Sequence, residues 1–116
     1  MNADVPRPAG RPVVFLGGAA IKTPPFTGEV RVEAGMLLGR LQEGEMLGMP
    51  ASRPMPSIGP RCHELRIAGA GHDWRIVYRI DPDAIVVPCL FPKGSKKTPK
   101  QQVDLIRRRL AEYDAE

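Results

Sequence analysis

Two arginines stand inside strand-like segments of the chain, where a cation is costly unless it meets solvent or a polar partner. Arg66 and Arg75 lie in two successive runs of alternating residues that a short Gly-rich segment joins. On neighbouring strands their guanidinium groups can converge, and each can make paired hydrogen bonds to one phosphate. Ordinary cross-strand ion pairs, with Glu64 or Asp73 as the acidic partner, are the alternative that the pattern leaves open.

A lysine-rich loop follows the last strand-like run and leads into the start of a helix. Residues 91–100 read FPKGSKKTPK. The Gly-Ser pair at positions 94 and 95 allows the backbone to approach a ligand closely, although the glycine spacing is not that of a P-loop. The loop therefore places basic side chains at the rim of the same predicted sheet, and a solvated basic loop is the plainer interpretation.

Other side chains with chemical potential have simpler roles in this pattern. Cys62 and His63 lack further ligands at zinc spacing, so no metal site is predicted, and we expect both thiols to be reduced. Alternation places His63 among apolar neighbours, and Tyr78 shares its strand face with Ile76. Cys89 has no histidine partner. We expect packing roles for His63, Tyr78 and Cys89.

The excess of positive over negative charge is confined to the second half of the chain. Residues 1–52 carry five basic and five acidic side chains, whereas residues 53–109 carry twelve basic and five acidic ones, a net charge of +7. The residues after 110 contribute −3, which gives +4 for the whole chain. Such a localised excess indicates a nucleic acid or an acidic protein as partner, and a solvated basic surface is the alternative.

The chain has the composition of one small domain with a tail. We expect residues 1–11, rich in proline and polar residues, to be disordered, and residues 12–116 to form a single domain. The first residues do not resemble a signal peptide, and no run approaches the roughly 18 apolar residues of a membrane span. We therefore predict a cytoplasmic protein that makes no membrane contact.

A first helix is predicted over residues 28–43. Thr27 is placed to act as its N-cap. Its buried stripe at helical spacing is predicted to consist of Val30, Ala34, Leu37, Leu38 and Leu41. Gly35 and Gly39 weaken this helix, and we expect them to permit close packing against another element such as the sheet.

Four strands and a second helix complete the prediction. The strands are a short edge strand at 12–16 and three runs at 62–67, 74–80 and 84–91 that form an antiparallel meander. Pro88 requires a bulge or an edge position. The Pro- and Met-rich segment between the first helix and the meander is expected to run over the surface. The last helix spans 99–113, with Thr98 as N-cap and Pro99 as its first residue.

These elements resemble the RelE/ParE toxin superfamily, and within it the phage-derived, HigB-like branch of type II toxin–antitoxin systems. The resemblance covers residues 13–113. Its carriers are MPSIGPRCHELRI at 55–67, WRIVYRID at 74–81, AIVVPCLFPKGSKKTP at 84–99 and RRRL at 107–110. It implies an α+β fold, in which an N-terminal helical segment packs on a small twisted antiparallel sheet and a C-terminal helix follows.

The resemblance also implies an activity, that of a ribosome-dependent mRNA endonuclease (mRNA interferase) that uses no metal and no cofactor. In this reaction the 2′-hydroxyl attacks the adjacent phosphodiester while basic residues stabilise the charge of the phosphorane. By position, the catalytic residues would be Arg66, Arg75 and Lys93. Further RNA contacts would come from Lys96, Lys97, Lys100, Arg79 and Arg61. The implied partners are mRNA on the ribosome and a cognate helix-turn-helix antitoxin.

Two departures from the family pattern keep other functions open. Gly94 and Ser95 interrupt the more continuous Phe-x-Lys-Lys-Thr loop of many relatives, and Cys89 stands where some relatives carry histidine or an acid. A reduced or absent nuclease activity follows if that position acts as acid or base. The alternatives are a ParE-like poison of DNA gyrase and a catalytically inactive, phage-derived protein that binds the antitoxin.

Overall fold

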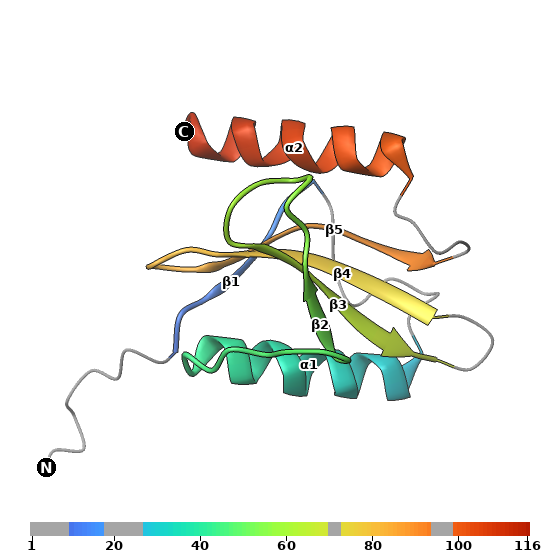
Figure 1. Ribbon diagram of the computed structural model, residues 1–116. Coiled ribbons are helices and arrows are strands. Elements are labelled where there is room, and N and C mark those ends of the chain that lie inside the picture. The colour runs from blue at the N-terminus through green and yellow to red at the C-terminus, as the bar shows by residue number, and fades with distance from the viewer. Residues whose placement is uncertain (1–9, 18–26, 70–72, 94–98) are drawn as a thin grey trace, which may run out of the picture.

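The chain folds into a five-stranded sheet held between two helices, one on each face (Figure 1). The computed structural model describes residues 10–17, 27–69, 73–93 and 99–116. In chain order the elements are β1 (Val13–Phe15), α1 (Gly28–Gln42), β2 (Ser52–Pro54), β3 (Cys62–Ala68), β4 (Asp73–Ile80), β5 (Ile85–Lys93) and α2 (Lys100–Asp114). The predicted α+β class is confirmed.

The sheet has the strand order β1-β5-β4-β3-β2, with β1 at one edge as predicted. Strands β2 to β5 are antiparallel neighbours, so the predicted meander is confirmed. The expectation of an antiparallel sheet fails at β1, which pairs with β5 in parallel. A parallel neighbour needs a long connection, and here the chain passes through α1 and three strands before β5 begins.

Helix α1 covers one face of the sheet because its apolar residues recur at helical spacing. All five residues of the predicted stripe are buried. The Thr27 side chain accepts a hydrogen bond from the Val30 N–H at 3.3 Å, which confirms the predicted N-cap. The expected role of the helix glycines is wrong, because a Cβ built at Gly35 or Gly39 would meet no described atom within 4 Å.

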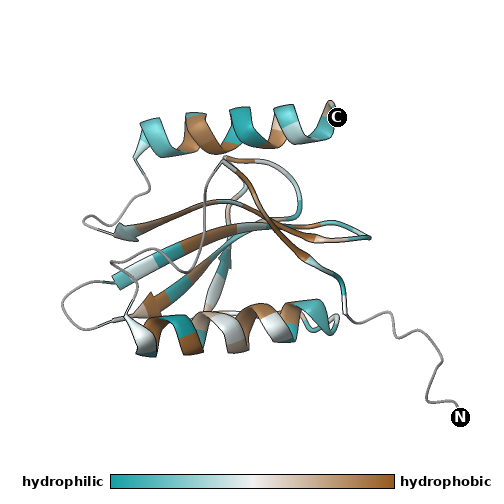
Figure 2. Ribbon diagram, turned by 180° about the vertical axis from the view of Figure 1, so that it is seen from behind, coloured by the Kyte–Doolittle hydropathy of each residue, from teal (hydrophilic) through white to brown (hydrophobic). Residues whose placement is uncertain are grey.

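Two separate apolar cores result, one beneath each helix (Figure 2). The core under α1 includes Leu65, Ile76 and Tyr78 from the inner strands. The core under α2 includes Val77 and Ile106. Strands β3, β4 and β5 contribute to both cores, as expected for strands that are covered on both faces.

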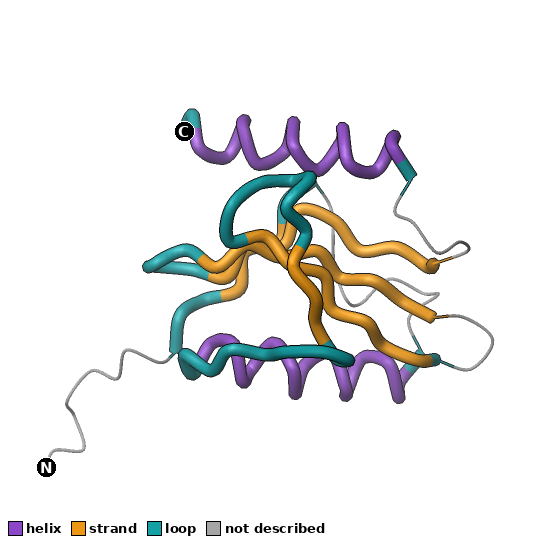
Figure 3. The backbone as a smooth tube through the Cα atoms, in the orientation of Figure 1, coloured by secondary structure: helices purple, strands orange, loops and turns teal. Residues whose placement is uncertain are grey.

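The connection between α1 and β3 differs from its prediction as a surface path. It contains the short strand β2, which pairs with β3 at the second edge of the sheet (Figure 3). It also buries Met55 and Ile58 in the core under α2. A three-residue strand that ends in proline carries no alternating pattern, so β2 is recognised only by its pairing with β3.

The predicted irregularity at Pro88 is confirmed as a bulge between β4 and β5, where the register shifts between Val77 and Arg79. The Pro88 carbonyl that this leaves free accepts a hydrogen bond from Arg109 Nη1 at 2.7 Å. The Arg109 side chain in turn lies against Gly17, where a Cβ would stand 2.3 Å from Nε. Gly17 therefore has two reasons to be glycine, this close approach and a φ of 58°.

Two predicted boundaries shift in the structure. Arg11, assigned to a disordered tail, is anchored because its guanidinium donates to the carbonyls of Asp81 and Leu41 at 3.0 and 3.2 Å. Helix α2 has Pro99 as its N-cap, without a side-chain cap bond, so it begins one residue later than predicted. Thr98, the predicted cap, lies outside the described residues, as do residues 1–9 of the tail.

Candidate functional site

The two arginines that the sequence singles out are direct partners in the sheet. Arg66 on β3 and Arg75 on β4 stand opposite each other in the antiparallel register. The Arg66 N–H donates to Ala51 O on the other side of β3 at 2.8 Å, so the Arg66–Arg75 pair is of the non-hydrogen-bonded kind, in which side chains come closest. Like charges directly opposite are destabilising, and this arrangement therefore attracts an anion.

A buried carboxylate lies beside this pair and neutralises part of it. Glu64 is fully buried on the same face of β3 as Arg66, and its Oε1 lies 3.3 Å from Arg75 Nε. This Nε makes no hydrogen bond to any described residue, although Arg75 Nη1 donates to Trp74 O at 3.3 Å. Burial lowers the pKa of Arg75, and the charge of Arg66 adds to this effect while Glu64 opposes it.

The structure adds a third arginine that the sequence analysis missed. Arg53 on β2 is the register partner of Glu64, and its Nε lies 3.4 Å from the same Oε1. The side chain of Arg53 is 36% exposed, whereas the side chain of Arg75 is 7% exposed. One carboxylate is thus shared by two guanidiniums, and Arg66 faces Arg75 without an ion-pair partner among the described residues. Arg53 was missed because β2 was not recognised as a strand in the sequence.

A small pocket adjoins the arginine cluster. Arg66, Arg75 and Asp73 line a hollow of about 230 Å³ together with Pro50, Ile67 and Ala68. The pocket joins one exposed arginine, one buried arginine and one exposed carboxylate. Its size suits a phosphate with part of its ribose rather than a whole nucleotide.

The predicted lysines are placed only in part. Lys93 ends β5 and is the backbone partner of Asp73, two residues along the strands from the row of Arg66, Arg75 and Phe91. The three predicted catalytic residues therefore come to the same end of the sheet. Lys100 is exposed and forms an ion pair with Asp104 at 3.0 Å within α2. Lys96 and Lys97 lie outside the described residues.

The predicted RNA contacts at Arg79 and Arg61 have a different setting. Arg79 is buried and makes four hydrogen bonds, two to Asp81 and two to Asp114, at 2.7–2.9 Å. These bonds raise the pKa of Arg79, with the Asp114 contact as the largest cause. The donors of Arg79 are thus turned to carboxylates of the fold, and the nucleic-acid contact expected there stays an untested prediction. Arg61 is exposed and also donates to Asp81, at 3.2 Å.

The model of the family described as phage-derived protein Gp49-like matches residues 26–111, which are 86 of the 116 residues. The chain belongs to the Gp49-like family. The phage-derived character expected from the sequence is thereby confirmed. No relative is found among the curated proteins.

The matched range relates the Gp49-like family to the site directly. It takes in α1, the strands β2 to β5 and most of α2, and it leaves β1 outside. Arg53, Glu64, Arg66 and Arg75 all lie within it. The arginine cluster thus lies wholly within the part of the chain that matches the Gp49-like family.

The remaining predicted packing residues take such roles in this Gp49-like domain. His63 stacks on Tyr78 with ring centroids 5.3 Å apart, and the Tyr78 hydroxyl is bonded to Ser52 Oγ at 2.7 Å. The Cys89 thiol donates to Gln102 Oε1 at 3.2 Å. Burial raises the pKa of both Cys62 and Cys89, so neither thiol is activated as a nucleophile.

The described ranges contain neither a cluster of metal ligands nor a membrane-spanning helix. Over residues 10–17, 27–69, 73–93 and 99–116, no three His, Cys, Asp or Glu side chains gather as metal ligands. In the same part of the chain, neither helix is long and apolar enough to span a bilayer. The arginine cluster around Glu64 is therefore the site on which a functional proposal rests.

Proposed function

We propose that this Gp49-like protein is the toxin of a type II toxin–antitoxin system and that it cleaves mRNA on the ribosome. The observation that carries the proposal is the register pair of Arg66 and Arg75 beside the shared carboxylate Glu64. Three guanidiniums against one buried carboxylate leave a positive charge that a phosphodiester can neutralise. Membership of a phage-derived family supports this proposal, since the resemblance to RelE/ParE toxins runs over the same segments.

The proposed reaction needs charge stabilisation more than covalent chemistry from the protein. The ribose 2′-oxygen attacks the adjacent phosphorus, the bond from phosphorus to the 5′-oxygen breaks, and a proton moves from the 2′-hydroxyl to the leaving 5′-oxygen through the site. Between these events the phosphorane carries extra negative charge. Arg75, buried and held beside Glu64, is preorganised to stabilise that charge without reorientation. Arg66, exposed at the pocket, binds the substrate phosphate.

Further basic residues of the chain would hold the RNA and the surrounding ribosomal RNA. Lys93 is in register with Asp73 at the pocket, and Lys100 opens α2. With Lys96 and Lys97 they give a sequence-independent, salt-dependent contribution to binding. A helix-turn-helix antitoxin is the proposed protein partner. Arg79 is left out of the proposed site, because its donors are already bonded to carboxylates.

One observation favours a second function, an inactive protein that binds its antitoxin. Cys89 stands where some relatives carry histidine or an acid, and its thiol is buried, protonated and bonded to Gln102. A neutral thiol with a raised pKa is a poor general acid or base at neutral pH. Without a general acid or base at this position, only Arg66, Arg75 and lysine contacts would remain to promote cleavage, and the chain could then bind its antitoxin without cutting RNA.

The experiment that tests the proposal maps mRNA 5′ ends in bacteria after brief induction of the protein. Wild type is expected to arrest growth and to produce new in-frame cuts in translated messages. Arg75→Ala is expected to reduce cleavage by about 10²–10³-fold, the cost of removing one preorganised donor. Arg108→Ala, at an exposed arginine of α2, is the matched control and should cut like wild type.

Three other outcomes assign the function elsewhere. Growth arrest with DNA damage and intact mRNA would indicate a gyrase-type target. Binding of an antitoxin without arrest or cuts would indicate the inactive protein. Cuts that persist in a folded Arg75→Ala variant would refute the assigned site, and a thermal melt of each purified variant shows whether it is folded.

A further inference from the structure

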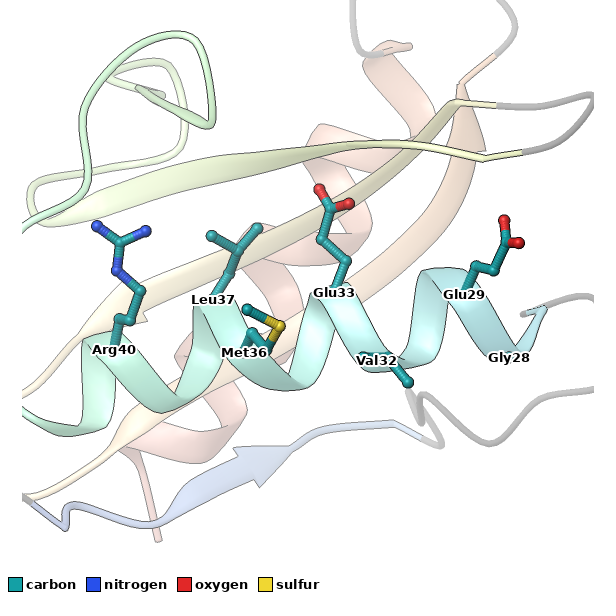
Figure 4. A pocket seen from close by; sticks show the side chains of 7 residues that line it. All are labelled: Gly28, Glu29, Val32, Glu33, Met36, Leu37 and Arg40. Atoms are coloured by element: carbon teal, nitrogen blue, oxygen red, sulfur yellow. The ribbon is translucent and has the colours of Figure 1, made fainter.

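The outer face of α1 carries apolar side chains that the fold does not use. Val32 is 64% exposed and Met36 is 66% exposed. They lie one helical turn apart on the side of α1 that faces away from the sheet, and they line an open groove of about 650 Å³ (Figure 4). This groove is larger than the pocket at Arg66 and Arg75, and the proposed nuclease chemistry does not involve it.

The apolar exposure is concentrated rather than scattered. The large hydrophobic residues that are exposed in the described ranges are Val32, Met36, Met46 and Met49, and all four belong to α1 or to the segment directly after it. A concentrated exposed apolar surface marks an interaction site more often than single exposed residues do. Methionine is also the residue that best adapts its shape to a partner.

The charges beside this apolar strip define the partner. Glu29 and Glu33 also lie one turn apart, and Figure 4 shows them projecting with Arg40 from one side of α1 while Val32 projects from the other. Neither glutamate forms an ion pair with another described residue. Arg40 is already paired with Glu45. The end of the groove near the helix start thus offers two carboxylates that no described residue neutralises.

The net charge of this surface argues against a second copy of the chain as its occupant. The stretch 28–45 carries four acidic and two basic residues, a net charge of −2. In a two-fold dimer the same patch faces itself, so acid would meet acid. Helix α2 lies on the opposite face of the sheet from α1, so its pairing with α1 of another copy would be a heterologous contact rather than a two-fold one.

The glycines of α1 fit the same role. Gly35 and Gly39 lower helix stability relative to alanine, and a Cβ built at either position would meet no described atom outside the helix within 4 Å. They lie beside Val32 and Met36, and because glycine has no side chain, the helix surface projects less at these two positions. A second helix can approach a glycine-lined surface more closely than one lined by longer side chains.

We propose that the groove on α1 is the docking site for a basic amphipathic helix of a partner protein. The apolar ridge of that helix would cover Val32 and Met36, and lysines or arginines one turn apart would face Glu29 and Glu33. Helix α1 lies on the opposite face of the sheet from α2 (Figure 1). Arg75 is on the α2 face, because it alternates along β4 with Val77, which belongs to the core under α2. The docked helix therefore leaves the arginine pocket open.

The test is a selection on the purified full chain from a library of helical peptides. Each peptide has a fixed leucine ridge, and its flanking positions are randomised between lysine and glutamate. Selected peptides should be enriched in lysine and bind in the micromolar range. Met36→Asp should weaken their binding at least tenfold, and its fold is checked by a thermal melt, since Met36 is exposed. The double variant E29K/E33K should reverse the enrichment to glutamate.

Control variants separate this proposal from the proposed nuclease. Arg75→Ala should bind the selected peptides as wild type does, whatever happens to RNA cleavage. The proposal is overturned by acidic enrichment on the wild-type chain, by binding that survives Met36→Asp, or by the absence of any binder. It is also overturned if sedimentation shows a dimer of the wild-type chain that Met36→Asp dissociates, since the occupant would then be a second copy.

Discussion

Arg75 and Arg79 lie four residues apart on the same face of β4, and they have opposite surroundings. Both are buried, with 6% and 8% of their surface exposed. Arg79 meets two carboxylates through four hydrogen bonds. Arg75 shares one carboxylate with Arg53 and stands opposite Arg66. The two positions therefore differ in the number of carboxylate partners for each guanidinium, and not in burial or residue type.

The partners of the two guanidiniums distinguish a structural arginine from a functional one. A guanidinium whose charge and donors are satisfied by the fold, as at Arg79, holds elements together, here the C-terminal end of α2 and the turn after β4. In a cluster with fewer carboxylates than guanidiniums, as around Glu64, burying the uncompensated positive charge costs free energy. Such a cluster can regain this free energy by binding an anion. Each of the following changes tests one side of this contrast.

The largest effect on stability is expected from Arg79→Met. The change leaves buried Asp81 with only the exposed Arg61 and frees Asp114, so the free energy of unfolding should fall by about 3–5 kcal/mol in urea denaturation. Arg61→Met is the matched control, since it contacts the same carboxylate from the surface, and it should cost less than about 1 kcal/mol. Equal losses in the two variants would contradict the contrast.

Glu64→Gln is expected to have the next largest effect. The change keeps the side-chain volume and removes the one charge between Arg53 and Arg75, so the fold should lose about 1–3 kcal/mol. RNA binding at low salt should become tighter, because the cluster gains a net positive charge. Cleavage should fall, since Arg75 loses the group that positions it. A variant that cleaves RNA as wild type does would show that Glu64 does not position Arg75.

The pH dependence of stability should report the Arg79 side of the contrast. The hydrogen bond from Arg79 lowers the pKa of Asp114 below its usual range. A lowered carboxyl pKa stabilises the folded state above the unfolded pKa of about 3.9, and this contribution is lost as the pH falls through the folded pKa. In melts from pH 7 to pH 2, Asp114→Asn should be about 1 kcal/mol less stable at neutral pH, and its acid decline should be shallower.

The smallest effect, and one of opposite sign, is expected from Arg66→Thr. Removal of the exposed arginine opposite Arg75 relieves a like-charge contact, so stability should stay level or rise by up to about 1 kcal/mol. RNA cleavage should be lost at the same time, a trade of stability against activity. Arg107→Thr, at an exposed position of α2, is the control. A clear loss of stability in Arg66→Thr would indicate a structural role.

Alternation and helical spacing predicted most of the fold because they record burial directly. The buried stripe of α1, the three-strand meander and the bulge at Pro88 follow from residue types along the chain. Strand β2 did not follow, since three residues are too few to show a period. Because β2 was not predicted, Arg53 was not identified as a residue of the candidate site.

The sequence by itself determined that Arg66 and Arg75 share a sheet face on adjacent strands, because the side-chain period of two and a short connection fix this. It also determined a basic second half and membership of the Gp49-like family. Only the tertiary structure decided which arginines keep unused charge. Asp114 reaches Arg79 across 35 positions and Arg53 reaches Glu64 across 11. Such pairings depend on how α2 and β2 pack, which no local pattern encodes.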